Sequence, residues 1–267
     1  MPTNSNGAPR RTALITGGSG GIGLELAKVL ARKGFDIVLV ARKRDTLEAA
    51  AGQLEGKFKI TAHVFAADLR RQEAPQAISD FLRNENIPIE ILVNNAGFGL
   101  GGEFVDTDLE RELEMIQVNI AALTQLTKLF LPAMIKRRSG RILNVASTAA
   151  FQPGPLMSVY YASKAYVLSF SEALAEELRE SGVTVTALCP GPTKTDFATT
   201  AKVGHSRLFT LFGVADAASV AEFGYQAMMQ GKRVAIPGAR NKLVAASHRF
   251  FPRDLVTKVA RMAQEKR

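Results

Sequence analysis

The sequence predicts an α/β fold in one domain: a doubly wound, seven-stranded parallel sheet with helices on both faces. Its 267 residues, 46% of them hydrophobic, suffice for one well-filled domain and hardly for two. Short apolar, β-branched segments alternate with longer segments of helical periodicity, as in a parallel sheet covered by helices. A strand, a glycine-rich loop, a helix and a second strand follow within about 30 residues, and right-handed crossovers then make the sheet doubly wound.

Seven segments are expected to form the strands, because their continuous apolar character suits burial on both faces of a sheet. They are residues 13–16, 36–41, 60–66, 89–94, 140–146, 183–188 and 233–236. Between the first two we expect a helix over residues 21–33 that ends at Gly34. Its apolar face consists of Ile22, Leu26, Val29 and Leu30. The predicted domain spans residues 12–237, between a flexible tail of residues 1–11 and a C-terminal extension of residues 238–267.

The loop TGGSGGIG at residues 16–23 has five glycines and can be interpreted in two registers. A G-x-G-x-x-G fingerprint would begin at Gly18, and a T-G-x-x-x-G-x-G loop would begin at Thr16; both end at Gly23. Either register brings backbone N–H groups to a helix N-terminus, where the helix dipole favours the phosphates of a dinucleotide. The loop alone leaves the register open, and a glycine-rich turn without a ligand is the alternative.

Tyr160 and Lys164 are four residues apart in a helical pattern, so their side chains project from the same face. The pKa of a free tyrosine is near 10, and a neighbouring ammonium favours the phenolate and lowers that pKa. Such a pair suits general acid–base catalysis on an alcohol/carbonyl couple. Ser147 ends an apolar strand at the carboxyl edge of the sheet, where its hydroxyl could donate to a developing oxyanion. Taken alone, Tyr160 and Lys164 could be a chance pair on a helix, and Ser147 could be a turn residue.

Taken together, these residues resemble the short-chain dehydrogenase/reductase family, in its single-domain type on a Rossmann fold. The resemblance runs from Thr12 to about Pro237, and its motifs occur in the family's order. They are the loop at 16–23, ADL at 67–69, NNAG at 94–97, the VN ending at Asn119, Ser147, the Tyr160 and Lys164 pair, and PGPTKT at 190–195. The family's loop is T-G-x-x-x-G-x-G, so the resemblance favours the second register. Gly18 and Gly20 are then spacers, at which the motif does not require glycine.

The resemblance implies that Tyr160 exchanges a proton with the substrate oxygen while hydride moves to or from a nicotinamide. Lys164 would lower the pKa of Tyr160 and bind the nicotinamide ribose, and Ser147 would polarise the carbonyl. Asn119 would hold a water that relays protons to Lys164, whereas Tyr161, on another helical face, is expected to pack. The implied cofactor-binding residues are Thr16, Gly17, Ser19, Gly21, Ile22, Gly23, Asp68, Leu69, Asn94, Ala96, Gly97, Tyr160, Lys164, Pro190, Gly191, Thr193 and Thr195.

The end of the second strand predicts NADP(H) as the cofactor. NAD sites usually place an acidic residue there, about 20 residues after the glycine loop, to bind the ribose hydroxyls. This strand ends in Ala41 and Arg42. Arg42 can bind a 2′-phosphate through two hydrogen bonds, and Lys43 or Arg44 can add charge. The alternative is that these are solvated charges at the start of a surface helix.

The resemblance implies that the substrate is enclosed by two segments, residues 148–158 and 196–213, and by the C-terminus. Their apolar side chains fit an acyl chain, a steroid-like ring or an aromatic ketone, but they also fit a lid that packs against its own domain. These side chains are Phe151, Leu156, Met157, Phe197, Leu208, Phe209, Leu211 and Phe212.

Positive charge gathers at the C-terminus, where the residues from Lys232 onward include ten basic and two acidic side chains and carry +8 of the net charge of +9. Residues 250–267 predict an amphipathic helix. Its apolar stripe consists of Phe250, Phe251, Leu255, Val256, Val259, Ala260 and Ala263. Two hypotheses stay open: weak peripheral contact with an anionic membrane, or a helix that caps the substrate lid or packs in a homo-oligomer.

The expected function is therefore an NADP(H)-dependent reductase of an apolar or acyl-type ketone. A non-catalytic NADP-sensing or scaffold protein is the alternative, which the presence of Asn119, Ser147, Tyr160 and Lys164 disfavours. The resemblance also implies a dimer or tetramer built on the helices that contain Asn119 and Tyr160.

Composition and motifs argue against a nucleic-acid-binding protein, a metalloprotein and a membrane protein. We expect no nucleic-acid partner, because no binding motif or aromatic platform accompanies the basic end. We expect no metal site, because the single cysteine, Cys189, lies in an apolar strand and the three histidines are scattered. Since no apolar run reaches the roughly 18 residues of a membrane span and residues 1–11 are polar, we expect a soluble protein of the cytoplasm.

Overall fold

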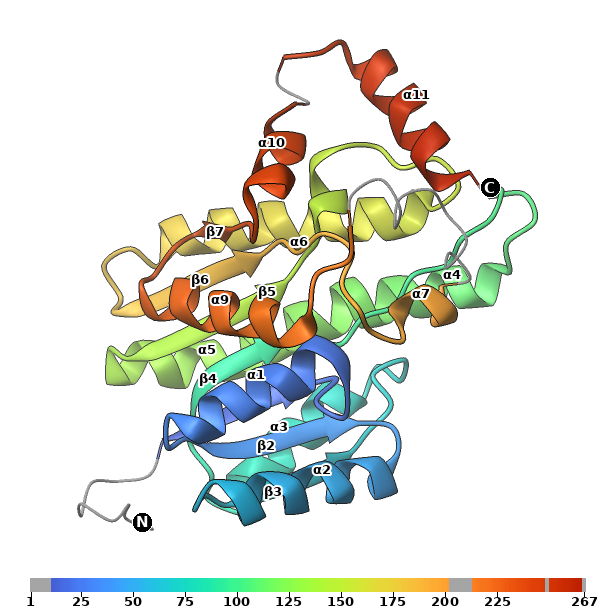
Figure 1. The fold of residues 1–267 in the computed structure, drawn as a ribbon. Coiled ribbons are helices and arrows are strands. Elements are labelled where there is room, and N and C mark those ends of the chain that lie inside the picture. Colours follow the sequence, from blue (N-terminus) through green and yellow to red (C-terminus); the bar gives the residue numbers. More distant parts are fainter. Residues whose placement is uncertain (1–10, 202–212, 248–249, 266–267) are drawn as a thin grey trace.

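One parallel sheet organises the molecule, with the strand order β3-β2-β1-β4-β5-β6-β7 (Figure 1). The structure is a computed structural model that describes residues 11–201, 213–247 and 250–265. From β1 the chain adds strands outward to β3, returns to the middle at β4, and then adds strands in the other direction. The strands are β1 Thr12–Thr16, β2 Asp36–Ala41, β3 Ala62–Ala66, β4 Ile89–Asn94, β5 Gly140–Val145, β6 Val183–Leu188 and β7 Val234–Ala235. The predicted doubly wound fold is confirmed.

Helices cover both faces of this sheet (Figure 1). One layer consists of α1 Gly21–Arg32, α2 Arg44–Lys57 and α9 Ala217–Met229. The other consists of α3 Ala74–Asn84, α4 Leu109–Ile116, the π-helical segment η1 Gln117–Ala122, α5 Leu123–Arg137 and α6 Ser158–Glu177. Shorter elements are η2 Thr148–Phe151, α7 Phe197–Thr200, α10 Ala239–Ser247 and α11 Arg253–Gln264.

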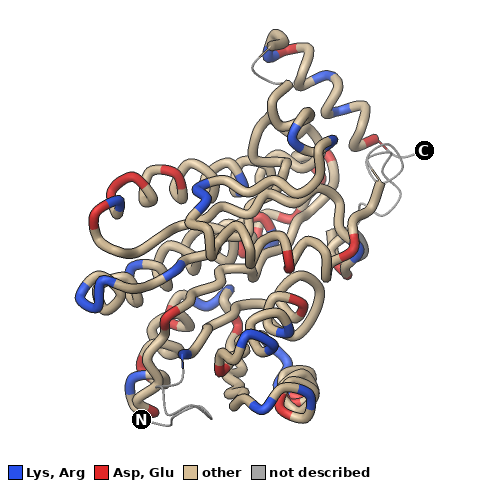
Figure 2. The backbone as a smooth tube through the Cα atoms, turned by 60° about the vertical axis from the view of Figure 1, so that its left-hand side comes forward, with Lys and Arg blue, Asp and Glu red and all other residues tan. Residues whose placement is uncertain are grey.

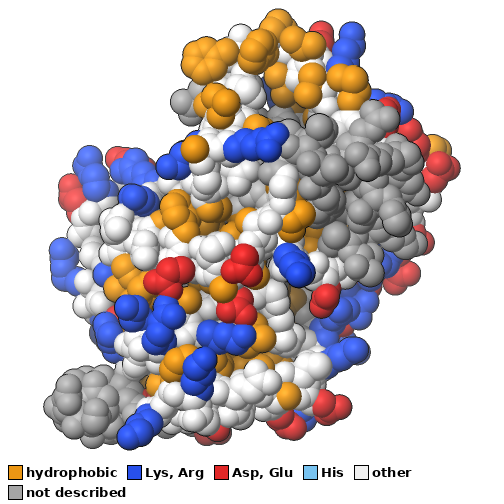
Figure 3. Space-filling model, viewed as in Figure 1, with side chains coloured by type: hydrophobic (Ala, Val, Ile, Leu, Met, Phe, Trp, Pro, Cys, Tyr) orange, Lys and Arg blue, Asp and Glu red, His pale blue; other side chains and the backbone are white. Residues whose placement is uncertain are grey.

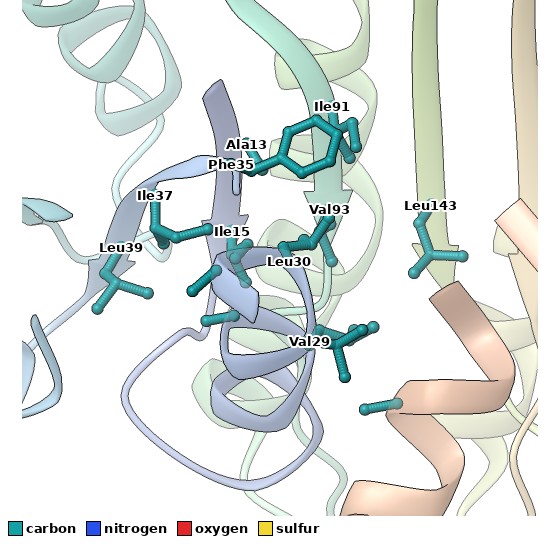
Figure 4. Packing of buried hydrophobic residues seen from close by; sticks show 14 of the residues in the cluster. Ala13, Ile15, Val29, Leu30, Phe35, Ile37, Leu39, Ile91, Val93 and Leu143 are labelled. Carbon is teal, nitrogen blue, oxygen red and sulfur yellow. The ribbon is translucent and has the colours of Figure 1, made fainter. Parts of the chain in front are cut away.

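The core has two halves, one on each side of the sheet, because successive side chains of a strand point to opposite faces. Ala13 and Ile15 of β1 pack in the cluster beneath α1, whereas Leu14 between them packs in the cluster beneath α3 and α5. Figure 4 shows Leu30 and Val29 of α1 against the first of these faces. The continuous apolar strands therefore supply both clusters at once.

At the edge strands, the predicted start of β3 is two residues too early, and the predicted β7 is one residue too long at each end. β3 begins at Ala62 and is half-buried throughout, and β7 has only two residues, Val234 and Ala235, with pairing on one side alone. Elsewhere the predicted boundaries agree within one residue. Helix α1 ends at Arg32, and Gly34 follows with a φ of +80°, which a residue without a Cβ adopts freely.

Helices α4, η1 and α5 form one continuous helix, Leu109–Arg137, that is long and apolar enough to cross a membrane by length and composition alone. The sequence analysis does not anticipate this, because the segment contains charged residues within its apolar run. In the fold, α5 packs on β4 and β5, and 39% of the most apolar window is buried. Core packing accounts for part of its apolar character, as expected for a helix on a sheet.

The predicted C-terminal extension forms α10 and α11, which rise from the carboxyl edge of the sheet beyond the two helical layers (Figure 1). Helix α11 begins at Arg253, after Pro252, and not at Phe250. Of the predicted flexible tail, all but Arg11 lies outside the described residues.

Candidate active site

A cleft of about 870 Å³ opens at the carboxyl edge of the sheet. Its wall is formed by the segments that follow β1 to β6 and by helices α10 and α11. Ligands of open α/β sheets bind at this edge, where the strand order reverses.

Backbone geometry in the glycine loop supports the T-G-x-x-x-G-x-G register. Gly17 and Gly21 have φ of +66° and +54°, a left-handed conformation that favours glycine. A Cβ on Gly23 would lie 2.3 Å from the carbonyl oxygen of Gly17, so α1 can approach the loop only with a glycine there. Gly20 faces open space, as predicted for a spacer, but Gly18 does not, since its Cβ would lie 2.7 Å from Leu39 Cδ2.

Thr16 and Asn95 fix this loop to the end of β4. The Thr16 hydroxyl accepts hydrogen bonds from the backbone N–H groups of Asn95 (3.1 Å) and Ala96 (3.0 Å). The Asn95 amide in turn donates to the carbonyl oxygens of Thr16 and Gly17. Sequence reasoning missed Asn95, the second asparagine of the NNAG motif. It lines the cleft, whereas Asn94 is buried in a hydrogen bond to Asn144.

Positive charge lies where a nucleotide phosphate would bind. Arg42 and Lys43 follow β2 and line the cleft, with no acidic residue at this strand end. Arg44 does not line the cleft, and its guanidinium pairs with Glu48 at 3.4 Å. These positions suit a 2′-phosphate, which an acid would repel.

Asp68, expected to bind the cofactor, is held by a neighbour that the sequence analysis missed. Arg70 Nε donates to both carboxylate oxygens of Asp68, at 3.0 and 2.9 Å, and Arg70 Nη1 donates to Glu114 of α4 at 2.8 Å. Hydrogen bonding from Arg70 lowers the pKa of Asp68, so its carboxylate stays ionised. The network anchors one end of the cleft to α4.

Ser147, Tyr160 and Lys164 converge on one wall of the cleft. Ser147 follows β5 and caps η2, where its hydroxyl accepts from the N–H of Ala149 at 3.1 Å. Tyr160 and Lys164 lie on the same face of α6, and both are buried. The predicted helical pair therefore exists and meets the strand-end serine.

Burial acts on this pair in a direction that the sequence analysis does not predict. Burial raises the pKa of Tyr160, although a hydrogen bond from Ser147 opposes the rise. Burial also lowers the pKa of Lys164 to about 8. The expected lowering of the Tyr160 pKa by Lys164 is thus wrong for the structure described here. The physical reason is that the ammonium is 5.9 Å from the Tyr160 ring centre and donates to the Val145 carbonyl oxygen at 2.8 Å.

Asn119 lies behind the cleft wall, in the π-helical segment η1. Its amide nitrogen donates to the Phe98 carbonyl and to Ser163 Oγ, both at 3.0 Å, and its oxygen accepts from the Phe98 N–H at 3.1 Å. These bonds join η1 to the segment after β4 and to α6, next to Lys164. Single π-helical turns often occur at functional sites, and no pattern in the sequence marks this one.

Only some of the side chains predicted to enclose the substrate line the cleft. Met157 and Phe197 line the cleft, and the Phe197 ring centre is 5.2 Å from that of Tyr160. Phe151 packs away from the cleft against the cluster around Leu123, so its predicted pocket role is wrong. Leu156 also lies outside the cleft lining. Leu208, Phe209, Leu211 and Phe212 lie outside the described residues.

Helix α11 closes the substrate side. Val256, Ala260 and Ala263 face the cleft. Gln264 donates a hydrogen bond of 2.6 Å to the Tyr161 hydroxyl, and Arg261 pairs with Glu103 at 2.8 Å. Tyr161 packs, as predicted, and it also lines the cleft.

Most predicted site residues line this cleft: Gly17, Ser19, Gly21, Ile22, Arg42, Lys43, Asp68, Leu69, Ala96, Gly97, Ser147, Tyr160, Lys164, Pro190, Gly191, Thr193 and Thr195. Four lie behind it, namely Thr16, Gly23, Asn94 and Asn119. These four hold the wall in place and do not form it.

The outer surface of α10 and α11 combines apolar and basic residues. Phe250 is 80% exposed, and Leu243, Leu255 and Met262 are also exposed. Figure 3 shows hydrophobic side chains gathered over these two helices, and Figure 2 shows Lys and Arg along them. The predicted apolar stripe is therefore only partly buried by the cleft.

Comparison with known proteins adds a family match to this geometry. The model of the short chain dehydrogenase family matches residues 11–204. The chain is 36% identical over 202 residues to hydroxysteroid dehydrogenase-like protein 1 of Gallus gallus, a match that covers 74% of this chain and 60% of that protein. It is also 36% identical over 182 residues to the very-long-chain 3-oxoacyl-CoA reductase of Bos taurus, covering 67% and 58%.

A solved structure resembles the whole arrangement. A short-chain dehydrogenase from Sphingobium yanoikuyae in complex with NADPH superposes with a TM-score of 0.81 at 34% identity, covering 90% of this chain and 91% of the other.

Proposed function

The chain belongs to the short-chain dehydrogenase family, an oxidoreductase family that uses nicotinamide cofactors on small molecules, and on this premise we propose an NADP(H)-dependent reductase that converts a ketone to a secondary alcohol. The observation that carries the proposal is the convergence of Ser147, Tyr160 and Lys164 in one cleft with the glycine loop. Together these three side chains offer a proton donor, a hydrogen-bond donor and a cation in one part of the wall.

Tyr160 is the proposed general acid. Burial raises its pKa, so the phenol is protonated at neutral pH and can donate to the carbonyl oxygen of the substrate. Ser147 would hold that oxygen and polarise the carbonyl. The bound cofactor would supply the hydride, and cellular NADP pools, which are kept reduced, favour this direction.

Lys164 would bind the nicotinamide ribose and belong to the proton relay that serves Tyr160. Asn119 would hold a relay water near Lys164. The surroundings of Gly97 support this role for Asn119. A Cβ on Gly97 would lie 3.0 Å from Asn119 Oδ1 and 3.4 Å from Lys164 Nζ, so both groups lie beside the same glycine.

We propose NADP(H) over NAD(H) because Arg42 and Lys43 line the cleft at the strand end where an acid would otherwise bind the ribose. The similar structure from Sphingobium yanoikuyae, which is in complex with NADPH, supports this choice. The left-handed Gly17 and Gly21 and the N-terminus of α1 provide the anion-binding loop that a dinucleotide phosphate needs.

An apolar or acyl-type ketone is the proposed substrate. Met157, Phe197 and the α11 residues Val256 and Ala260 give the substrate side an apolar wall. The names of two relatives, a hydroxysteroid dehydrogenase-like protein and a very-long-chain 3-oxoacyl-CoA reductase, agree with large apolar substrates. Because the matches span 60% and 58% of those proteins, their activities serve here as candidates for testing.

Three further points belong to the proposal. Exposed Leu109, Leu113 and Ile116 on α4 favour a homo-oligomer built on the helices that hold Asn119 and Tyr160. The apolar and basic surface of α10 and α11 favours weak contact with anionic membrane. The enzyme is proposed to work in the cytoplasm, which cell fractionation would test.

The decisive experiment is NADPH oxidation with a panel of ketones: 3-oxoacyl thioesters of several chain lengths, steroid ketones, aromatic ketones and sugars. We expect turnover with at least one apolar ketone, and its loss in Tyr160→Phe with cofactor binding retained. Tight NADPH binding without turnover of any ketone would instead support a non-catalytic NADP-sensing or scaffold protein. Full activity in Tyr160→Phe would refute the proposed acid.

A further inference from the structure

Gln264 is the last residue of α11, and its side chain lies in the cleft wall although it is far from the catalytic motifs in sequence. The residue is only 6% exposed. Its amide nitrogen donates a hydrogen bond of 2.6 Å to the hydroxyl of Tyr161, the residue directly after the proposed acid. One end of the amide is therefore fixed to α6.

The other end of the amide has no such partner. Gln264 Oε1 is buried, and no group of the described residues lies within hydrogen-bond distance of it. Buried polar side-chain atoms in proteins are nearly always hydrogen-bonded, and one that is not calls for an explanation. Because this atom belongs to a side chain that lines a ligand cleft, a ligand group is the natural partner.

The amide is held in place from two sides. The Tyr161 ring packs so closely on Gly154 that a Cβ there would lie 2.1 Å from the Tyr161 Cγ, which fixes the hydroxyl that Gln264 binds. The Tyr161 ring is also 6.1 Å from the Tyr160 ring, edge to face. At the other side, Arg261 and Glu103 anchor the same turn of α11 to the segment after β4.

From this geometry we propose that Gln264 is a specificity-determining residue whose Oε1 accepts a hydrogen bond from an O–H or N–H group of the substrate. The inference rests on the proposed function and deepens it. Around Gln264 the α11 wall is apolar, with Val256, Ala260 and Ala263, so the substrate would be an apolar ketone with one hydrogen-bond donor near the carbonyl. A hydroxy ketone and an acyl thioester with an amide in its thiol arm both have this chemistry.

Two substrate pairs distinguish these sources. One pair is the 3-oxodecanoyl thioester of N-acetylcysteamine and its N-methyl analogue, which lacks the N–H. The other is an aromatic hydroxy ketone and its methyl ether. In the wild-type enzyme we expect kcat/KM to be about 10-fold higher for the donor in at least one pair, because a polar site discriminates against analogues that leave it unpaired.

Gln264→Met keeps the length of the side chain and removes the acceptor, so the preference is expected to fall to about one. Gln264→Glu keeps an acceptor oxygen and a partner for the Tyr161 hydroxyl, so the preference is expected to persist. Arg261→Gln is the matched control: it weakens the second anchor of α11 and should leave the preference unchanged. A preference that Arg261→Gln also abolishes would assign the effect to helix docking and overturn the inference.

Equal kcat/KM within both pairs in the wild-type enzyme would overturn the inference while leaving the reductase proposal intact. If no ketone is turned over, the reductase proposal fails, and calorimetric binding of the same pairs to the NADPH-loaded protein tests Gln264 alone. Tighter binding of the donor member, lost in Gln264→Met, would support it. Equal binding would reject it.

Discussion

The ammonium of Lys164 lies 5.9 Å from the centre of the Tyr160 ring and gives a hydrogen bond of 2.8 Å to the carbonyl oxygen of Val145. Both side chains are buried, and burial moves their pKa values apart: that of Tyr160 rises and that of Lys164 falls to about 8. Lysine is thus the member of the pair that titrates close to neutral pH, while the tyrosine keeps its proton.

The first prediction is that kcat/KM for ketone reduction decreases as pH rises through about 8. Lys164 is cationic below this pKa and loses its proton above it, whereas Tyr160 remains protonated. Rate measurements from about pH 6 to pH 10 test this. Lys164→Arg keeps the charge and should move the alkaline decrease upward. A profile that is level through pH 8 would contradict the role given to the ammonium.

The glycine loop gives a second prediction, on stability and cofactor binding. Gly23→Ala places a Cβ 2.3 Å from the Gly17 carbonyl oxygen, so the loop must shift; we expect a loss of about 1–3 kcal/mol in the free energy of unfolding and at least about 10-fold weaker NADPH binding. Gly20→Ala, with open space around it, should change the unfolding free energy by less than about 0.5 kcal/mol. Urea unfolding compares the two. Equal destabilisation would argue against the register.

The third prediction concerns cofactor choice. Arg42→Ala is expected to weaken NADPH binding by about 10- to 100-fold and to leave NADH binding unchanged, since only NADPH carries the 2′-phosphate. Arg44→Ala removes a charge two residues away that pairs with Glu48 outside the cleft, and it should alter neither affinity much. Fluorescence titration of both cofactors measures the change. If Arg42→Ala kept the wild-type preference, Arg42 would not select the cofactor.

A fourth prediction follows from α4. Leu109, Leu113 and Ile116 are spaced to share one face, and they are 70%, 55% and 38% exposed. Leu113→Glu is expected to dissociate a homo-oligomer, with size-exclusion chromatography and light scattering as the measurement. Val105→Glu introduces the same charge at an 88% exposed residue that precedes α4, and this variant should leave the homo-oligomer intact. A wild-type monomer would remove this surface from the proposal.

The fifth prediction tests the surface of α10 and α11. Wild-type protein should sediment with vesicles that contain anionic lipid at physiological salt and be released at high salt. Phe250→Glu, at an 80% exposed position outside the cleft lining, should lose this binding. Phe104→Glu makes the same change at a 65% exposed residue elsewhere and should keep it. If the wild-type protein does not sediment, the membrane contact is rejected.

The elements predicted well from sequence are those whose local pattern has a single structural solution. β1, β2 and β4 are apolar in their central positions because helices cover both of their faces, and Gly17 and Gly21 are glycines because their φ is positive. Ser147 and Tyr160 were found because a strand end and a helical spacing locate them independently of their neighbours.

The rest depends on contacts between distant segments. Asn94 and Asn95 are adjacent and identical, and only the turn after β4 decides that Asn95 enters the cleft. Gln264 is one polar residue in a basic helix until α11 docks on Tyr161. The direction of the Tyr160 pKa shift follows from burial. The spacing of Tyr160 and Lys164 in the sequence does not show how deeply the two side chains are buried.

The cleft is assembled from two separable stretches of chain. The family match ends at residue 204, and it includes the glycine loop, Ser147, Tyr160 and Lys164; α10 and α11, which complete the opposite wall, come after it. Exchanging the last two helices between related enzymes would therefore transplant selectivity without rewriting the reaction. Under the proposed function, changes near the C-terminus would therefore alter the choice of substrate while the catalytic residues stay as they are.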